Sequence, residues 1–174
     1  MQRLNIDTSH SGVHFTARHM VVTKVRGVFH GWSGTIDYDP ERIERSSVTV
    51  EIDAASIDTR EPKRDGHLKS ADFFDVENHP KLTFKSTKVE RTGDGLKVTG
   101  DLTIRGVTKP VTLDVEEQGS AKDPWGNTRL LWAASAKINR KDWGLNWNQV
   151  LEAGGVLVSE KIDLEFEVQA LPAG

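Results

Sequence analysis

The chain contains no cysteine among its 174 residues, which excludes disulfide bonds, thiolate metal ligands and a thiol nucleophile. It also lacks long apolar runs: the stretch 130–134 is among the longest, far below the ~20 residues of a membrane-spanning helix. A basic excess is missing too, because 23 Lys and Arg stand against 26 Asp and Glu. We therefore predict no nucleic-acid partner and no stable membrane insertion.

Signal-peptide features are also missing at the N-terminus. The first seven residues enter a strand-like pattern without a basic segment and an apolar stretch behind it. We expect a cytoplasmic protein, or a periplasmic one if a leader was removed. The length suits one domain, and no repeat, linker or low-complexity tract divides the chain. The sequence therefore predicts a single domain over residues 1–174.

The dominant pattern is strict alternation of apolar and polar residues, which is typical of half-buried β-strands. The clearest run places Ile162, Leu164, Phe166 and Val168 on one face and charged or amide side chains on the other. Short connections between neighbouring runs favour antiparallel pairing. The pattern predicts roughly eight or nine strands, and the other runs lie at 13–19, 28–38, 48–54, 82–86, 96–104, 111–115 and 130–138.

The segment 57–80 departs from this alternation. Asp58 or Thr59 can cap a helix there, and Pro62 suits its first turn. Gly66 weakens the helix, so we expect a short one. Its predicted apolar anchors are Leu68, Phe73 and Phe74.

Strands with one apolar and one charged face require a closed or sandwiched sheet. Eight antiparallel strands can close into a barrel, whose interior is either filled by side chains or holds one small ligand. We predict an all-β barrel with a short helical crossover. Small residues in mid-strand, such as Ala17, Ala54, Gly100 and Ala134, would leave room inside. Alternation alone leaves the cavity and the filled interior equally open.

Histidines give little support for a metal site. His10 and His14 lie four residues apart, a distance of ~13 Å along a strand, and zinc needs three or four convergent ligands. We predict no metal and no cofactor. His19 shares its parity with Phe15 and Ala17 and should point inward, as a structural group or as a polar contact for a ligand.

Motifs for a nucleophile, a zinc protease or a phosphate-binding loop are missing from the sequence. We therefore predict a protein without catalysis. The alternative is an enzyme that uses His19 as acid or base, with Arg140 and Asp142.

Five tryptophans are the more unusual feature. Trp143 and Trp147 flank an apolar irregular loop, and such rings can line a hydrophobic slot or its opening. Trp125 falls in the turn 123–127, where we expect ordinary loop packing.

Several ordered motifs resemble the YceI-like family, the polyisoprenoid-binding, lipocalin-like barrels of bacteria. The resemblance covers almost the whole chain. Its motifs are IDTSHSGVHF at 6–15, RHM at 18–20, VRGVF at 25–29, GTI at 34–36, DGHLKSADFFDV at 65–76, PKLTFKS at 80–86, GDLTIRGVTKPV at 100–111, NRKDWG at 139–144 and VSEKI at 158–162.

The resemblance implies an eight-stranded lipocalin-like barrel whose apolar tunnel holds an isoprenoid chain, such as a polyprenol or a quinone tail, for transport or storage. It also implies a homodimer, and it is compatible with a role in a stress response. The family motif often has Phe in place of Trp143, and the larger ring would shorten or reshape the tunnel. The predicted lining comprises Phe15, Ala17, His19, Phe29, Ile36, Val48, Val50, Phe74, Phe84, Leu102, Ile104, Leu113, Trp132, Ala134, Ile138 and Trp143.

Three functions therefore remain open from the sequence. The first is a carrier or store for an isoprenoid lipid or quinone. The second is the enzyme acting on such a lipid through His19. The third is a protein-interaction barrel with a filled interior.

Overall fold

The computed structural model describes residues 1–149 and 158–173 of the chain. Antiparallel strands dominate it, with one α-helix, α1 (Pro62–Lys69), and three 3-10 turns at Ile43–Arg45, Ala54–Ser56 and Arg140–Trp143. The strands are β1 (Gln2–Ile6), β2 (Gly12–His19), β3 (Thr23–Phe29), β4 (Trp32–Tyr38), β5 (Ser47–Asp53), β6 (Ile57–Asp58), β7 (Lys81–Thr92), β8 (Gly95–Ile104), β9 (Val107–Lys122), β10 (Thr128–Asn139) and β11 (Lys161–Pro172).

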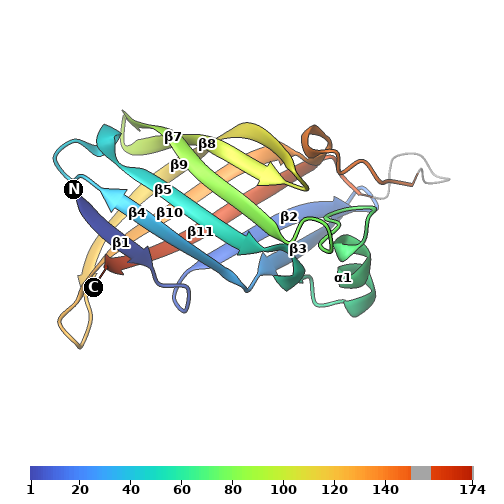
Figure 1. Cartoon of the computed structure of the whole chain (residues 1–174), viewed down its shortest axis with the longest axis horizontal. Coiled ribbons are helices and arrows are strands. Elements are labelled where there is room, and N and C mark those ends of the chain that lie inside the picture. The colour runs from blue at the N-terminus through green and yellow to red at the C-terminus, as the bar shows by residue number, and fades with distance from the viewer. Residues whose placement is uncertain (150–157, 174) are drawn as a thin grey trace.

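The sheet closes on itself through β1, which pairs with β4 on one side and with β11 on the other. This closure makes an antiparallel ring of β1, β4, β5, β7, β8, β9, β10 and β11 (Figure 1). The predicted eight-stranded barrel is confirmed. Beyond the end of β1, β2 takes its place beside β11, and β3 and the short β6 follow. These additional pieces raise the strands among the described residues above the eight or nine expected.

The interior follows the predicted alternation. Along β8, every second residue is buried, namely Leu96, Val98, Gly100, Leu102 and Ile104, whereas the residues between them are exposed or partly exposed. At Gly100, a Cβ atom would lie 2.5 Å from Cζ of Phe84. The glycine therefore lets the Phe84 ring lie over the neighbouring strand β8, so the space at Gly100 is filled and not left empty.

The crossover begins differently from the prediction. The N-cap of α1 is Glu61, whose carboxylate accepts hydrogen bonds from the Lys63 and Arg64 amides at 3.3 and 2.6 Å. Asp58 or Thr59 was therefore the wrong cap. Pro62 occupies the first turn, where a missing N–H costs nothing, and this places the cap one residue before it.

The crossover covers one end of the barrel, and both chain termini lie at the other end (Figure 1). Phe73 is buried, and Leu68 and Phe74 pack against the core. The three predicted anchors of the segment are thus confirmed. They hold the crossover over the barrel end and exclude water from it.

Candidate functional site: an apolar cavity open at one end

A cavity of about 160 Å³ lies inside the barrel. Its wall is apolar apart from Tyr38, Ser46, Ser47 and the indole nitrogens of two tryptophans. Residues from β1, β2, β4, β5, β7, β8, β9, β10 and β11 contribute to it. The lining is Ile6, Gly12, Val13, Trp32, Ile36, Tyr38, Ile43, Ser46, Ser47, Val48, Val50, Ile52, Phe84, Val89, Leu96, Val98, Leu102, Val111, Leu113, Val115, Trp132, Ala134, Leu164, Phe166 and Val168.

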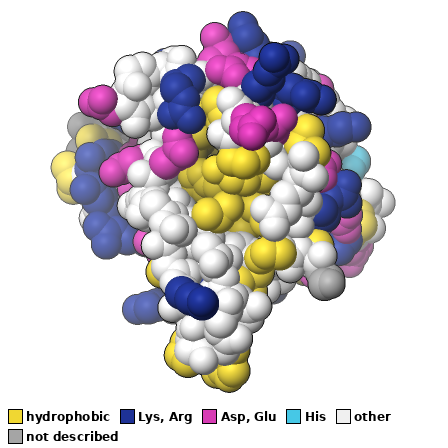
Figure 2. All heavy atoms as spheres, turned by 90° about the vertical axis from the view of Figure 1, so that its left-hand side faces the viewer, with side chains coloured by type: hydrophobic (Ala, Val, Ile, Leu, Met, Phe, Trp, Pro, Cys, Tyr) yellow, Lys and Arg dark blue, Asp and Glu magenta, His cyan; other side chains and the backbone are white. Residues whose placement is uncertain are grey.

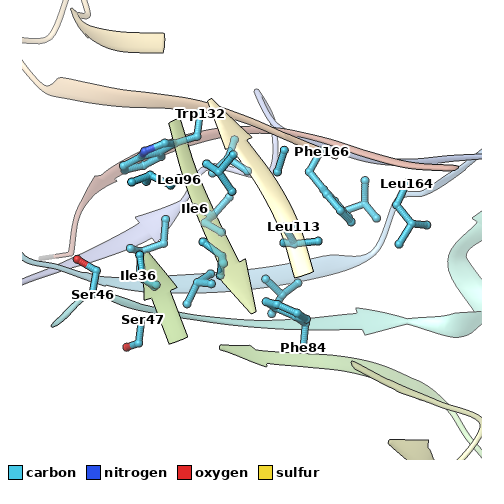
Figure 3. Close-up of a pocket in the computed structure, with 18 of the residues that line it drawn as sticks. Ile6, Ile36, Ser46, Ser47, Phe84, Leu96, Leu113, Trp132, Leu164 and Phe166 are labelled. Atoms are coloured by element: carbon cyan, nitrogen blue, oxygen red, sulfur yellow. The ribbon is translucent and has the colours of Figure 1, made fainter. Parts of the chain in front are cut away.

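The cavity opens at the end of the barrel that carries the chain termini. Figure 2 faces this end and shows hydrophobic side chains in a hollow at its centre, with both acidic and basic side chains around it. In Figure 3, Ile36, Ser46, Ser47 and Trp132 lie at one end of the cavity. We call this end, together with Tyr38, the mouth.

Tyr38 and Trp132 are aromatic residues at the mouth, and each carries one polar group, a hydroxyl and an indole N–H. Their rings meet edge to face, with centroids 5.7 Å apart. Burial, followed by the nearby Glu117 carboxylate, raises the pKa of Tyr38, and Arg91 opposes this effect. The phenol therefore stays protonated at neutral pH, and its hydroxyl group makes no hydrogen bond with the part of the chain that the structure describes. It can donate a hydrogen bond to a ligand.

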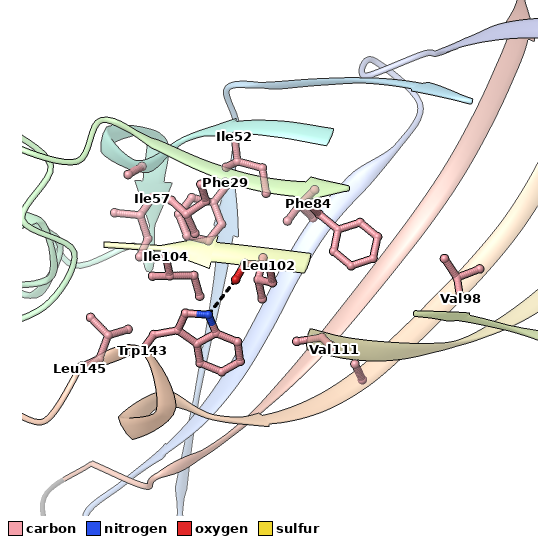
Figure 4. Close-up of a cluster of buried hydrophobic side chains, with 14 of the residues drawn as sticks. Phe29, Ile52, Ile57, Phe84, Val98, Leu102, Ile104, Val111, Trp143 and Leu145 are labelled. Carbon is pink, nitrogen blue, oxygen red and sulfur yellow. Dashed lines mark hydrogen bonds between the residues drawn. The ribbon is translucent and has the colours of Figure 1, made fainter. Parts of the chain in front are cut away.

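At the opposite end, Trp143 and Leu145 from outside the strands join strand residues to close the barrel (Figure 4). Trp143, from the turn after β10, is 2% exposed. Its indole N–H donates to the Leu102 carbonyl at 2.9 Å. Phe29, Ile104 and Leu145 belong to the same buried cluster as this ring. We call this region the closed end.

Arg140 fastens the closed end. It is 3% exposed, and its guanidinium donates to four backbone carbonyls. Nε reaches Ser159 at 2.8 Å, Nη1 reaches Leu145 and Trp147 at 2.5 and 2.9 Å, and Nη2 reaches Val158 at 3.3 Å. Burial lowers the pKa of Arg140, and the charge of Glu160 opposes this. A group committed to four carbonyls is structural, which removes Arg140 from the predicted catalytic set.

Half of the predicted lining residues border the cavity. They come from β4, β5, β7, β8, β9 and β10, whose alternation was read correctly. They are Ile36, Val48, Val50, Phe84, Leu102, Leu113, Trp132 and Ala134.

The other predicted residues lie outside the cavity. Most of them pack in or beside the closed end, where neighbouring side chains fill the space. These are Phe15, Phe29, Phe74, Ile104, Ile138 and Trp143.

Ala17 and His19 lie farther along β2, away from the cavity lining. Ala17 borders an open, mixed-charge crevice on the outside of β2, β3 and β11. The backbone of His19 forms an isolated antiparallel β-bridge with Val158. The expected inward position of His19 therefore does not bring its imidazole into the cavity.

Sequence reasoning missed several lining residues that share the parity of those it selected. Leu96 and Val98 lie on the same face of β8 as Leu102, and Leu164, Phe166 and Val168 form the clearest alternating run in the chain. The signal was present for these five. Ser46 and Ser47 gave no signal, because a serine before a strand is typical of any turn.

Within residues 1–149 and 158–173, no group of three His, Asp or Glu side chains is arranged to hold a metal ion. In the same part of the chain, no helix has the length and apolarity needed to cross a bilayer. Among the residues described, the cavity also contains no acid–base pair. The arrangement can enclose an apolar chain and meet a polar group at the mouth.

Known proteins share this architecture. The model of the YceI-like domain matches residues 4–170. Protein YceI of Escherichia coli O157:H7 is 39% identical over 169 residues, covering 97% of this chain and 85% of the relative. BcnA of Burkholderia cenocepacia superposes with a TM-score of 0.81 at 23% identity, covering 94% of this chain and 98% of that one.

A third match is a polyisoprenoid binding domain from Saccharophagus degradans, implicated in plant cell wall breakdown. It has a TM-score of 0.71 at 16% identity and covers 99% of this chain and all of that one. The fold and cavity define a closed antiparallel barrel with an apolar interior. The family match is more specific: this chain belongs to the YceI-like family.

Proposed function

We propose that the protein binds an isoprenoid lipid, a polyprenol or the tail of a quinone, and carries or stores it without catalysis. The observation that carries this proposal is the apolar cavity that opens at one end of the barrel. Each CH₂ group moved from water into such a cavity contributes about 0.8 kcal/mol. A branched hydrocarbon can therefore bind tightly without polar contacts. The Saccharophagus domain, which shares the fold, is described as polyisoprenoid binding.

The polar head group would remain at the mouth. Tyr38 offers a protonated hydroxyl group there, and Ser47 offers another beside it. Both suit the hydroxyl group of a polyprenol or the carbonyl of a quinone, because each of these accepts a hydrogen bond.

The cavity volume sets the length of chain that fits without rearrangement. A cavity of about 150 Å³ holds one benzene molecule, so about 160 Å³ accommodates about one five-carbon isoprene unit. A longer chain must displace lining side chains or extend through the mouth. We therefore expect the cavity to enlarge when the ligand binds, through rotamer changes at lining residues such as Leu96 and Leu113.

The enzymatic alternative is weaker on this geometry. His19 does not line the cavity, and the titratable group that does, Tyr38, is at the mouth with a raised pKa. Turnover of a lipid that is lost in His19→Ala, and that survives substitution of the lining, would establish an enzyme instead.

Native mass spectrometry of the freshly purified protein, followed by solvent extraction, tests the proposal. A discrete added mass that resolves to an isoprenoid is the expected result. The matched variants are Leu113→Trp, which fills the cavity, and Thr112→Trp, which points outward from the same strand. If the larger side chain of the Leu113→Trp variant excludes two CH₂ groups of the ligand from the cavity, the ligand should bind about tenfold more weakly. Equal uptake of farnesol or longer polyprenols by the two variants, or a wild type that binds none of them, would refute a cavity-bound isoprenoid.

A further inference from the structure

Trp125 is the most exposed large hydrophobic side chain in the described part of the molecule. It is 80% exposed, in the loop between β9 and β10. The expectation of ordinary loop packing was wrong for this residue. A tryptophan left in water loses the favourable burial of its large ring, so its position calls for a partner that covers it.

The loop holds the indole in a defined position. The Asp123 carboxylate accepts hydrogen bonds from the backbone amides of Trp125 and Asn127 at 3.0 and 2.9 Å. The Asp123 amide donates to the Asn127 carbonyl at 2.9 Å, and Gly126 supplies the left-handed turn with φ of 86°. Trp125 is thus displayed on a hydrogen-bonded turn and not on a loose chain.

The turn is also attached to the barrel. Arg129 donates to Asp123 at 3.2 Å and to Asp7, between β1 and β2, at 2.5 Å. Burial would raise the pKa of Asp123, but the hydrogen bonds from Asn127 and Trp125 outweigh it, and the pKa is lowered overall. The carboxylate is therefore ionised at neutral pH, and the link between loop and barrel persists.

The loop extends from the end of the barrel that carries the mouth. In Figure 1 it lies at the same end as both chain termini. In Figure 2 the same loop is the lowest projection and ends in hydrophobic side chains, on the face that shows the apolar hollow. The loop that carries Trp125 and the cavity opening therefore lie at the same end of the barrel.

We propose that Trp125 docks the mouth onto the surface of a phospholipid bilayer. Tryptophan favours the interface between head groups and acyl chains, because its ring is apolar and its N–H is polar. Figure 2 shows charges of both signs around the mouth, and the net charge is −3. Insertion of the indole, not attraction to anionic lipid, is the basis of the docking.

A protein partner fits the loop less well. Stable protein interfaces bury about 800 Å² on each side around a contiguous apolar centre. Among the described residues, the exposed sequence neighbours of Trp125 include the apolar Ala121 and Pro124 but also Lys122, Gly126 and Asn127, so the apolar patch on the loop is far smaller than such a centre. A single displayed indole suits shallow, reversible insertion into lipid.

The purpose of this docking rests on the proposed function, since it identifies the bilayer as the source or recipient of the isoprenoid. Docking itself is measurable without any ligand. Flotation with neutral phosphatidylcholine vesicles should show binding of the wild-type protein. Quenching of its tryptophan fluorescence by brominated lipid should show the same binding. Trp125→Ser should bind the vesicles about tenfold more weakly, and Trp125→Tyr should retain part of the binding.

Val22→Ser is the matched control. Val22 is 75% exposed in the turn between β2 and β3, at the opposite end of the barrel. It should float like the wild type. Anionic vesicles and neutral vesicles should give similar binding at low and high salt.

Uptake of farnesol separates the two proposals. Trp125→Ser should take up farnesol more slowly than wild type from vesicles, and equally well from cyclodextrin, which requires no membrane. Vesicle binding that is equal in Trp125→Ser and wild type, or absent in both, would overturn the docking while uptake from cyclodextrin still supports the carrier. Trp125-dependent flotation without uptake from either donor would support the docking and overturn the carrier.

Discussion

The two ends of this barrel are built from strands of the same pattern, yet one end is hollow and the other is packed. Leu102 and Ile104 lie two residues apart on one face of β8; the first borders the cavity and the second lies in the closed end. The difference comes from side chains supplied from outside the ring. Trp143 and Leu145 fill the closed end, whereas at the mouth the turn between β4 and β5 supplies the smaller Ile43, which leaves the cavity beside it open. Alternation thus makes an apolar interior, and the connections decide whether it is filled.

Two tryptophans test this comparison with the largest expected effect. Trp143→Ala removes a ring that is 2% exposed and fully surrounded, so unfolding should become easier by about 3–5 kcal/mol. Trp132→Ala removes a partly exposed ring that borders empty space, and about 1–2 kcal/mol should be lost because fewer contacts disappear. Urea denaturation measures both. Equal losses would mean that the mouth is packed as tightly as the closed end.

Two alanines on one face of β10 sharpen the comparison. Ala136 is 8% exposed in the core cluster, and Ala136→Phe should destabilise the protein by about 1–3 kcal/mol through overpacking. Ala134 borders the cavity, so Ala134→Phe should change stability by less than about 1 kcal/mol and reduce ligand uptake. Thermal and urea unfolding of the pair would decide the matter. A larger loss for Ala134→Phe would place the free space elsewhere.

Acid should loosen the loop between β9 and β10, at the mouth end, before it loosens the closed end. This is the smallest of the three expected effects on stability. Hydrogen bonds lower the folded-state pKa of Asp123 below its ordinary 3.8. The stabilisation from the ionised Asp123 carboxylate is therefore fully present above pH 3.8 and is lost as the pH falls through the folded-state pKa. Arg140 donates to carbonyls, which do not titrate.

Amide NMR signals of Trp125 and Asn127 should therefore shift below that pH, while those of Leu145 stay in place. Asp123→Ala should show the loosened loop at every pH. Simultaneous loss of both regions would show that the two ends do not respond separately.

The sequence predicted the barrel and half of the candidate lining because burial on a strand repeats every second residue. Leu113 and Ala134 could be assigned to the cavity from parity alone. Phe29 and Ile104 also lie on the apolar faces of their strands, but they share a buried cluster with Trp143, which comes from a turn distant in sequence. Nothing local in the chain encodes that meeting. Likewise, the role of Arg140 depends on carbonyls that only the folded loop brings together.

The pairing of β1 with β11 has a topological consequence. Leu4 lies opposite Pro172, and the Ala173 amide donates to the Arg3 carbonyl at 2.9 Å. The first and last strands are therefore stitched together beside the mouth. A short linker between them would turn the chain into a circle, and a cut at 20–22 would yield a circular permutant with the same ring of strands. Its new ends would lie at the far end of the barrel. A label or a support attached to them would leave the cavity opening unobstructed.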